Sequence, residues 1–253
     1  PAGYYCDDQG TKQACDTGKW SPAGSGDISE CISCVAGKYS TTPNAGSDSS
    51  CIDCEIGKFS TDIGSDNESS CIVCPLGKYI NTTGGTTCID CTAGSYCATA
   101  GLTAPTGLCD PAYYCTGAAI AATQEVDTST GGRCTVGHYC PQGTGSPMAC
   151  PSGQYSRGYG NTACSQCPSG RYSAAAAGQC IPCNAGKYSA STGSSGCQAC
   201  SAGQYAMRIG SSKCTSCPTG YFSTGAGATS FLPPTKSEKL LKDIQNEKNR
   251  QKQ

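Results

Sequence analysis

The feature that most constrains this chain is a short motif, Cys-x-x-Gly-x-aromatic, which recurs along most of its length. In residues 34–40 it reads Cys-Val-Ala-Gly-Lys-Tyr-Ser. Its glycine recurs at Gly3, Gly18, Gly37, Gly57, Gly77, Gly94, Gly137, Gly153, Gly170, Gly186, Gly203 and Gly220, and Ala112 replaces it in one further copy. The aromatic residue is Tyr5, Trp20, Tyr39, Phe59, Tyr79, Tyr96, Tyr114, Tyr139, Tyr155, Tyr172, Tyr188, Tyr205 or Phe222. A short motif repeated in register predicts a tandem array of small units.

The residue types of one unit predict its local structure. Glycine permits the positive φ or the close backbone approach that a tight turn needs. The aromatic residue is the only large apolar side chain in most units, so we expect it to lie across the neighbouring disulfide as a small core. Stacked units would contact only their neighbours. The predicted fold is an elongated, solenoid-like rod of small disulfide-rich repeats, built from short β-hairpins and loops with little other regular structure.

Composition indicates that disulfides hold this chain together. It contains 24 Cys among 253 residues, but only 25 residues that are Leu, Ile, Val or Phe, too few for a conventional hydrophobic core. Closing a loop of about fifteen residues with a disulfide contributes roughly 3 kcal/mol on the chain-entropy account. Disulfides persist in oxidising compartments, so we expect an extracellular protein, secreted or at the cell surface.

Hydropathy and charge argue against a transmembrane helix and against nucleic-acid binding. No run of eighteen apolar residues is present, so no transmembrane helix is predicted. The chain has no initiator Met and no signal peptide, so we expect Pro1 to begin a mature or trimmed chain. The net charge is −1, with six positive and three negative side chains in residues 236–252. Without a basic stripe elsewhere, nucleic acid is not an expected partner.

The spacing of the cysteines divides the chain into four expected segments. Residues 1–94 and 150–229 hold regular repeats, most with Cys-x-x-Cys pairs. Cys91, Cys109 and Cys134 are each followed by a second cysteine six residues later, and we interpret the divergent segment 95–149 as a joint. Residues 230–253 form a charged tail in which Thr235 and Glu238 have capping-box spacing. A C-terminal helix and a solvated tail are both compatible with that segment.

The repeats resemble a known family. Residues 180–189 read Cys-Ile-Pro-Cys-Asn-Ala-Gly-Lys-Tyr-Ser. This sequence resembles the ephrin-receptor-like cysteine-rich repeat, which is similar to the growth-factor-receptor and tumour-necrosis-factor-receptor cysteine-rich class. Arrays of this kind occur in surface and secreted proteins of protists. The resemblance extends over about residues 1–225.

The resemblance also implies a disulfide pairing, in which the second cysteine of one pair bonds the first cysteine of the next. The implied bonds are Cys15–Cys31, Cys34–Cys51, Cys54–Cys71, Cys74–Cys88, Cys150–Cys164, Cys167–Cys180, Cys183–Cys197 and Cys200–Cys214. It leaves eight cysteines unassigned, namely Cys6, Cys91, Cys97, Cys109, Cys115, Cys134, Cys140 and Cys217. Sequence alone does not settle their connectivity.

The sequence contains few residues suited to catalysis or to metal binding. Cys-x-x-Cys pairs also bind zinc, but an aromatic residue in every repeat favours structural disulfides, so no metal or cofactor is expected. His138 is the only histidine and occupies a variable position of its repeat, so we expect no catalytic residue and no enzyme. Basic residues precede several aromatics, namely Lys38, Lys58, Lys78, Arg171 and Lys187. We interpret these residues as a solvated face whose aliphatic side-chain stems pack on the aromatic rings. A weak site for anionic glycans is the less favoured interpretation.

Two glycosylation motifs lie in polar loops, Asn67-Glu68-Ser69 and Asn81-Thr82-Thr83. In a secreted chain such motifs accept N-linked glycan. We expect glycan on Asn67 or Asn81.

Two functions remain open from the sequence. The favoured one is a structural subunit of a filament, surface coat or appendage; the alternative is a receptor or adhesin ectodomain stalk that binds a protein or glycan ligand. Cys6 and Cys217 are left over when cysteines are counted unit by unit, and in an extended array they cannot meet within one molecule. Head-to-tail contact between copies, with Tyr5 and Phe222 stacked across the joint, would complete the broken repeat. A fragment of a longer array is equally compatible with that count.

Overall fold

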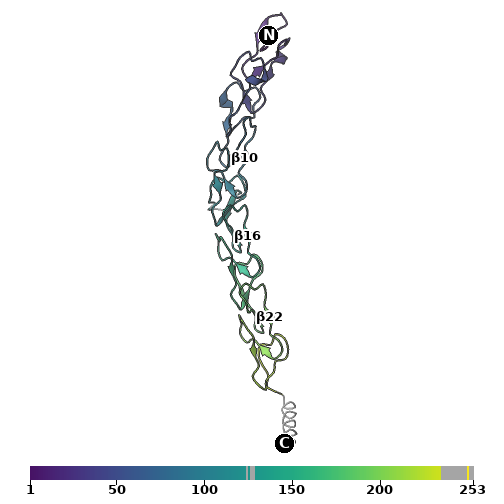
Figure 1. Ribbon diagram of the computed structural model, residues 1–253, viewed down its shortest axis with the longest axis vertical. Helices are drawn as coiled ribbons and strands as arrows, with labels where there is room; N and C mark the ends of the chain where they lie inside the picture. Colours follow the sequence, from purple (N-terminus) through teal and green to yellow (C-terminus); the bar gives the residue numbers. More distant parts are fainter. Residues whose placement is uncertain (124, 126–128, 235–249, 251–253) are drawn as a thin grey trace. The chain divides into compact units, whose positions relative to one another are not determined.

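A computed structural model describes residues 1–123, 125, 129–234 and 250. The chain divides into two compact units, residues 1–133 with 140–146 (unit 1) and residues 134–139 with 147–253 (unit 2). Within each unit, small hairpins follow one another along the chain (Figure 1). The segment from Thr235, for which the sequence leaves a helix and a solvated tail both open, lies outside the described residues except for Arg250.

The strands pair in sequence order as two-stranded antiparallel hairpins. In unit 1 the pairs are β1 (Tyr4–Cys6) with β2 (Lys12–Ala14), β3 (Lys19–Trp20) with β4 (Ile32–Ser33), β5 (Lys38–Tyr39) with β6 (Ile52–Asp53), β7 (Lys58–Phe59) with β8 (Ile72–Val73), β9 (Lys78–Tyr79) with β10 (Ile89–Asp90), β11 (Ser95–Tyr96) with β12 (Gly107–Leu108), and β13 (Tyr113–Cys115) with β14 (Gly131–Arg133). In unit 2 they are β15 (His138–Tyr139) with β16 (Met148–Ala149), β17 (Gln154–Tyr155) with β18 (Ser165–Gln166), β19 (Arg171–Tyr172) with β20 (Ile181–Pro182), β21 (Lys187–Tyr188) with β22 (Gln198–Ala199), and β23 (Gln204–Tyr205) with β24 (Thr215–Ser216). Three 3₁₀ turns precede closing strands of unit 1, η1 (Ile28–Glu30), η2 (Asp48–Ser50) and η3 (Glu68–Ser70).

The motif forms a tight turn followed by a strand. In the repeat that starts at Cys34, the Lys38 N–H donates to the Val35 carbonyl over 3.1 Å. The glycine between them, Gly37, has φ +82°, as the third position of a type II turn requires. The chain then enters β5, where Tyr39 faces Ile52 of β6. The prediction of small disulfide-rich repeats with short hairpins is confirmed.

The core consists of cysteines rather than aromatic rings. Cys54, Cys74 and Cys150 are each 0% exposed, whereas Tyr39 and Tyr79 are only half-buried. Tyr96 packs against the buried cluster of Cys109, Cys115 and Ala119, as expected of a ring that lies across a disulfide. A hairpin of two-residue strands is too small to enclose a ring on both faces, so the ring covers its repeat from one side.

The disulfides follow two patterns. Eight bonds join the start of a motif to its closing strand, with Cα–Cα distances of 5.6–5.8 Å, and they are Cys15–Cys31, Cys34–Cys51, Cys54–Cys71, Cys74–Cys88, Cys150–Cys164, Cys167–Cys180, Cys183–Cys197 and Cys200–Cys214. These are the pairs that the resemblance implies. Cys91–Cys97 and Cys109–Cys115 instead close within one motif. Cys134 and Cys140, with the same six-residue spacing, are disulfide-bonded as well.

The second pattern has a local cause. The position three residues after the motif glycine is buried and usually small, as at Ser40 and Ser173, both 0% exposed. In the six-residue repeats this position is a cysteine, for example Cys97 after Tyr96. A cysteine there bonds the cysteine at the start of its own motif, Cys91 in this case. The closing strand then needs no cysteine, which explains the pairing that the sequence left open.

Candidate functional site

The joint between consecutive repeats is held by backbone hydrogen bonds. The N–H of Gly18 donates to the Ser40 carbonyl over 2.9 Å, and the N–H of Ser21 donates to the Ala45 carbonyl over 3.0 Å. Both acceptors lie in the next repeat along the chain. Because these bonds use only the backbone, the joint tolerates variable side chains in the loops.

Contacts also reach the second repeat downstream. A Cβ added to Gly18 would lie 2.2 Å from the carbonyl oxygen of Gly64, which belongs to the repeat after the next one. The same arrangement occurs for Gly3 with Asn44, Gly37 with Gly84, Gly57 with Gly101, Gly77 with Ala118, Gly94 with Gly143, Gly137 with Ala176, Gly153 with Gly193, Gly170 with Gly210, and Gly186 with Gly227. The covering residue has a left-handed backbone in every case, including the non-glycine residues Asn44, Ala118 and Ala176. The expectation that repeats contact only their neighbours is therefore wrong, since the bare glycine lets a more distant turn pack against it.

The last two repeats lack this cover. Among residues 1–234 that the structure describes, nothing lies within 4 Å of the Cβ position on Gly203 or Gly220. The Gly203 N–H donates to the Ser223 Oγ over 2.8 Å, whereas the N–H groups of most earlier motif glycines donate to backbone carbonyls of the next repeat. These two glycines therefore mark a repeat edge with no described residue packed against it.

The last repeat closes without a disulfide. Phe222 pairs with Leu232, as Tyr205 pairs with Thr215 one repeat earlier. Phe231 consequently stands where the closing cysteine would be, and its ring centroid lies 5.1 Å from that of Tyr205, edge to face. The Tyr221 ring also contacts Phe231, with the two ring centroids 5.1 Å apart. Sequence analysis missed this closure, although Phe231 follows Cys217 by fourteen residues, as Cys214 follows Cys200.

Both leftover cysteines are free thiols. Cys217 is half-buried, and Cys6 is exposed at the end of β1. Tyr5 precedes Cys6 and faces Gln13 of β2. The contact predicted between Tyr5 and Phe222 concerns separate copies of the chain and is taken up under the proposed function.

Both glycosylation motifs are exposed. Asn67 caps η3, where its Oδ1 accepts from the Ser69 N–H over 2.9 Å, and its Nδ2 donates to the Asp66 carboxylate. Asn81 lies in the exposed loop after β9. Glycan on either residue would project into solvent.

No metal-binding cluster is found in the described part of the chain. Nowhere do three His, Cys, Asp or Glu residues there gather closely enough to hold a metal ion. The His138 Nδ1 lies 3.2 Å from the Thr135 Oγ1 and 3.1 Å from the Val136 carbonyl oxygen, so it is engaged by its own turn. The described residues include no helix with the length and apolarity needed to cross a membrane.

Comparison with known proteins shows that the C-terminal repeats are similar to one family. Residues 170–211 and 186–232 match the family described as tyrosine-protein kinase ephrin type A/B receptor-like. These residues form ephrin-receptor-like repeats. No curated protein matches the chain. The family and the disulfides together indicate an extracellular domain.

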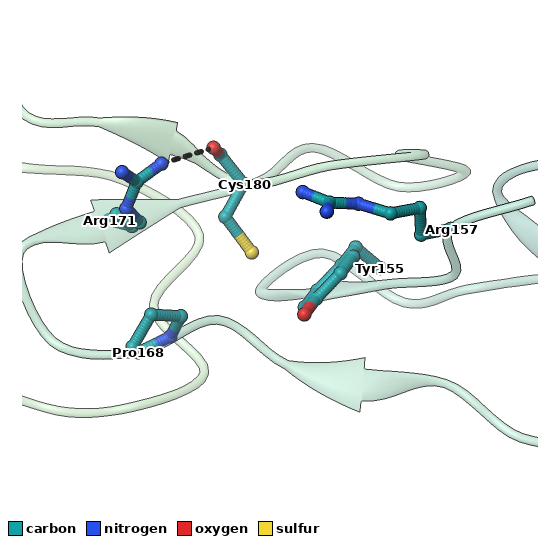
Figure 2. Close-up of a pocket in the computed structure, with 5 residues that line it drawn as sticks. All are labelled: Tyr155, Arg157, Pro168, Arg171 and Cys180. Atoms are coloured by element: carbon teal, nitrogen blue, oxygen red, sulfur yellow. Dashed lines mark hydrogen bonds between the residues drawn. The ribbon is translucent and has the colours of Figure 1, made fainter.

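One groove lies beside the first of the ephrin-receptor-like repeats (Figure 2). It has a volume of about 190 Å³ and is lined by Tyr155, Arg157, Pro168, Arg171 and Cys180. Arg171 donates one bond to the Cys180 carbonyl over 3.1 Å, which uses one of the several N–H donors that a guanidinium carries. Figure 2 shows the guanidinium groups of Arg171 and Arg157 on either side of Cys180.

The groove recurs one ephrin-receptor-like repeat later. Its second copy, also about 190 Å³, is lined by Tyr172, Asn184, Lys187 and Cys197. Tyr172, Asn184, Lys187 and Cys197 occupy the repeat positions of Tyr155, Pro168, Arg171 and Cys180. Both grooves therefore have one aromatic wall and at least one cation.

Proposed function

We propose that the chain is an extracellular structural subunit that joins copies of itself head to tail in a filament, surface coat or appendage. The observation that carries this proposal is the self-complementary packing of the repeats, in which a motif glycine receives a left-handed turn from further along the array; among the described residues this surface is uncovered at Gly203 and Gly220. In earlier repeats the equivalent surface receives a left-handed turn two repeats downstream. A turn from another copy of the chain has the same backbone shape, so the edge is complementary to the chain's own repeats.

Two residue pairs would strengthen such a joint. Cys6 and Cys217 are both free, and a disulfide between two copies would link them covalently. Tyr5 and Phe222 are the motif aromatics beside these cysteines, and they would stack across the joint. Contact between unlike ends of identical chains propagates without closing and produces a filament.

The proposal is tested on the purified full-length chain by electron microscopy and by non-reducing electrophoresis. We expect fibres and a ladder of multimers that collapses with reductant. Substituting Cys217→Ser should remove the ladder. The double variant Gly203→Ala and Gly220→Ala should assemble at least tenfold more weakly, because the added methyl groups stand where the incoming turns would pack.

Gly158→Ala provides the matched control. Gly158 also has a positive φ, +83°, with open space around its Cβ position, but it lies in a loop away from the edge. It therefore carries the same backbone strain without blocking the joint. A monomeric chain with no fibres at any concentration would contradict the proposal.

The second candidate is a receptor or adhesin stalk, which the cation-lined grooves of unit 2 favour. A stalk would remain monomeric and bind a protein or glycan through those grooves. Binding by a monomer, lost on Arg171→Gln, would support it over the structural subunit.

A further inference from the structure

Charge is segregated between the two units. Unit 1 contains 15 acidic and 6 basic side chains, a net charge of −9. Unit 2 as far as Pro234 contains five basic side chains, Arg157, Arg171, Lys187, Arg208 and Lys213, and no acidic one. The overall charge of −1 conceals this polarity.

In three repeats of unit 1 the cation is neutralised by carboxylates of the same unit, at Lys38, Lys58 and Lys78, whereas Lys19 faces Ser33 across its hairpin. Lys58, which occupies the position of Arg171 and Lys187, lies 3.3 Å from the Glu55 carboxylate and 2.8 Å from that of Glu68. Glu55 itself occupies the repeat position of Pro168 and Asn184, a wall of the unit 2 grooves. The repeat thus has room for a carboxylate beside its cation, as Glu55 beside Lys58 shows.

The neighbouring lysines of unit 1 are neutralised in a second way. Lys38 lies 3.0 Å from the carboxylate of Asp53, its cross-strand partner on β6. Lys78 forms an ion pair with Asp90, its partner on β10. Opposite charges facing one another across a hairpin stabilise the pair of strands.

In the part of the chain that the structure describes, the equivalent cations of unit 2 have no such carboxylate partner. Arg171 faces Pro182 across its hairpin, and Lys187 faces Ala199. Both side chains are exposed, as is Arg157. No Asp or Glu occurs between residues 128 and 237, so a carboxylate for these cations has to come from outside this segment.

We infer that the two grooves of unit 2 bind carboxylate side chains presented by the acidic unit 1 of a second copy of the chain. This inference rests on the proposed self-assembly and adds a second contact to the end joint, because the grooves lie upstream of Gly203 and Gly220 and would meet the acidic unit of a neighbouring copy. Complementary charge steers association and sets register. The exposed cations and the surplus carboxylates are both solvated, so salt screens their attraction.

The inference is tested by sedimentation velocity on the full-length chain at about 0.05, 0.15 and 0.5 M NaCl, salt concentrations that shorten the screening length severalfold. We expect self-association to weaken at least tenfold between the lowest and the highest salt concentration. The double variant Arg171→Gln and Lys187→Gln should weaken it at least tenfold at low salt. The matched control is Arg208→Gln with Lys213→Gln, which removes the same charge from unit 2 outside the grooves and should weaken it less than threefold.

The outcomes separate this inference from the proposed function. Association of the groove variant equal to that of the unaltered chain, or equal loss in both double variants, overturns the grooves as the docking site. A groove variant that associates normally but no longer binds immobilised heparin overturns the inference in favour of an anionic polysaccharide. Absence of association at every salt concentration overturns the proposed function, and the inference with it.

Discussion

A Cβ added to Gly186 would lie 2.0 Å from the carbonyl oxygen of Gly227, two repeats further along the chain. The same turn donates the Gly227 N–H to the Cys200 carbonyl over 2.8 Å. One turn therefore ties together three consecutive repeats. Disulfides secure each repeat separately, and these turns add contacts that span three repeats.

Gly186→Ala is predicted to weaken the contact between residue 186 and the turn at Gly227. The methyl group would strain the left-handed backbone of residue 186, which costs about 1–2 kcal/mol, and would also push the Gly227 turn away, at a further cost of about 1–3 kcal/mol. Hydrogen exchange of the Gly227 amide should accelerate about tenfold or more. Gly203→Ala is the matched control, because Gly203 has nearly the same φ, +80° against +82°, but no covering turn among the described residues. Equal effects of the two variants would argue that the second-neighbour contact is unimportant.

Phe231→Cys is predicted to form a new disulfide with Cys217. Phe231 occupies the closing-cysteine position of its repeat, and the loop it would close has the same length as that of Cys200–Cys214. Thiol titration of the denatured, unreduced variant should find one free thiol, that of Cys6. Closure of a loop of this size adds roughly 3 kcal/mol to the stability of the repeat, less what the lost ring contributes.

The neighbouring substitution Leu232→Cys is the control for this prediction. Adjacent residues of a strand point to opposite faces, so its thiol would be directed away from Cys217. Three free thiols are expected in this variant. Three free thiols in Phe231→Cys as well would show that the repeat position of residue 231 is misassigned.

Before it assembles, the unaltered monomer is predicted to carry two free thiols, with Cys6 the more reactive. Cys6 is exposed and Cys217 is half-buried, and accessible thiols are alkylated faster. Peptide mass spectrometry after a short treatment of monomeric protein with iodoacetamide should find Cys6 modified first. Stoichiometric zinc together with many free thiols would refute the disulfide framework.

N-linked glycan is predicted on Asn67 or Asn81. Both residues are exposed in loops of unit 1, and the Asn67 Nδ2, the atom that would receive the sugar, donates to the neighbouring Asp66 at the surface. Intact mass before and after treatment with an amide-cleaving glycosidase is the measurement, with Asn67→Gln and Asn81→Gln assigning the site. Unmodified peptides for both motifs would reject this prediction.

Stability is predicted to fall slightly in acid through Glu68. The side-chain hydrogen bond from Lys58 lowers the pKa of the Glu68 carboxyl below its ordinary value of 4.5. A carboxyl with a lowered pKa stabilises the folded state above its ordinary pKa, and this contribution is lost as pH falls through the lowered value. Glu68→Gln should therefore lower the melting temperature a little at pH 7 and leave it unchanged near pH 2. An equal shift at both pH values would exclude the ion pair as its cause.

Most of the structure within one repeat could be predicted from the sequence. The spacing of Cys34, Gly37 and Tyr39 specifies a turn followed by a strand, because glycine is the residue that adopts the positive φ required there. The resemblance supplied the pairing of the regular cysteines. These features depend on residues close together in the chain, where short spacing leaves few geometries.

Contacts between repeats were decided only by the tertiary structure. Gly18 and Gly64 are 46 residues apart, and their approach depends on how successive repeats stack, which no local pattern encodes. The role of Phe231 depends on the hairpin register that places it beside Tyr205. Likewise, Lys58 and Arg171 occupy the same repeat position, yet only the folded chain shows that Lys58 meets carboxylates while Arg171 faces a proline across its hairpin. Local spacing governs the structure inside a repeat, whereas packing across many residues determines what each repeat offers to a partner.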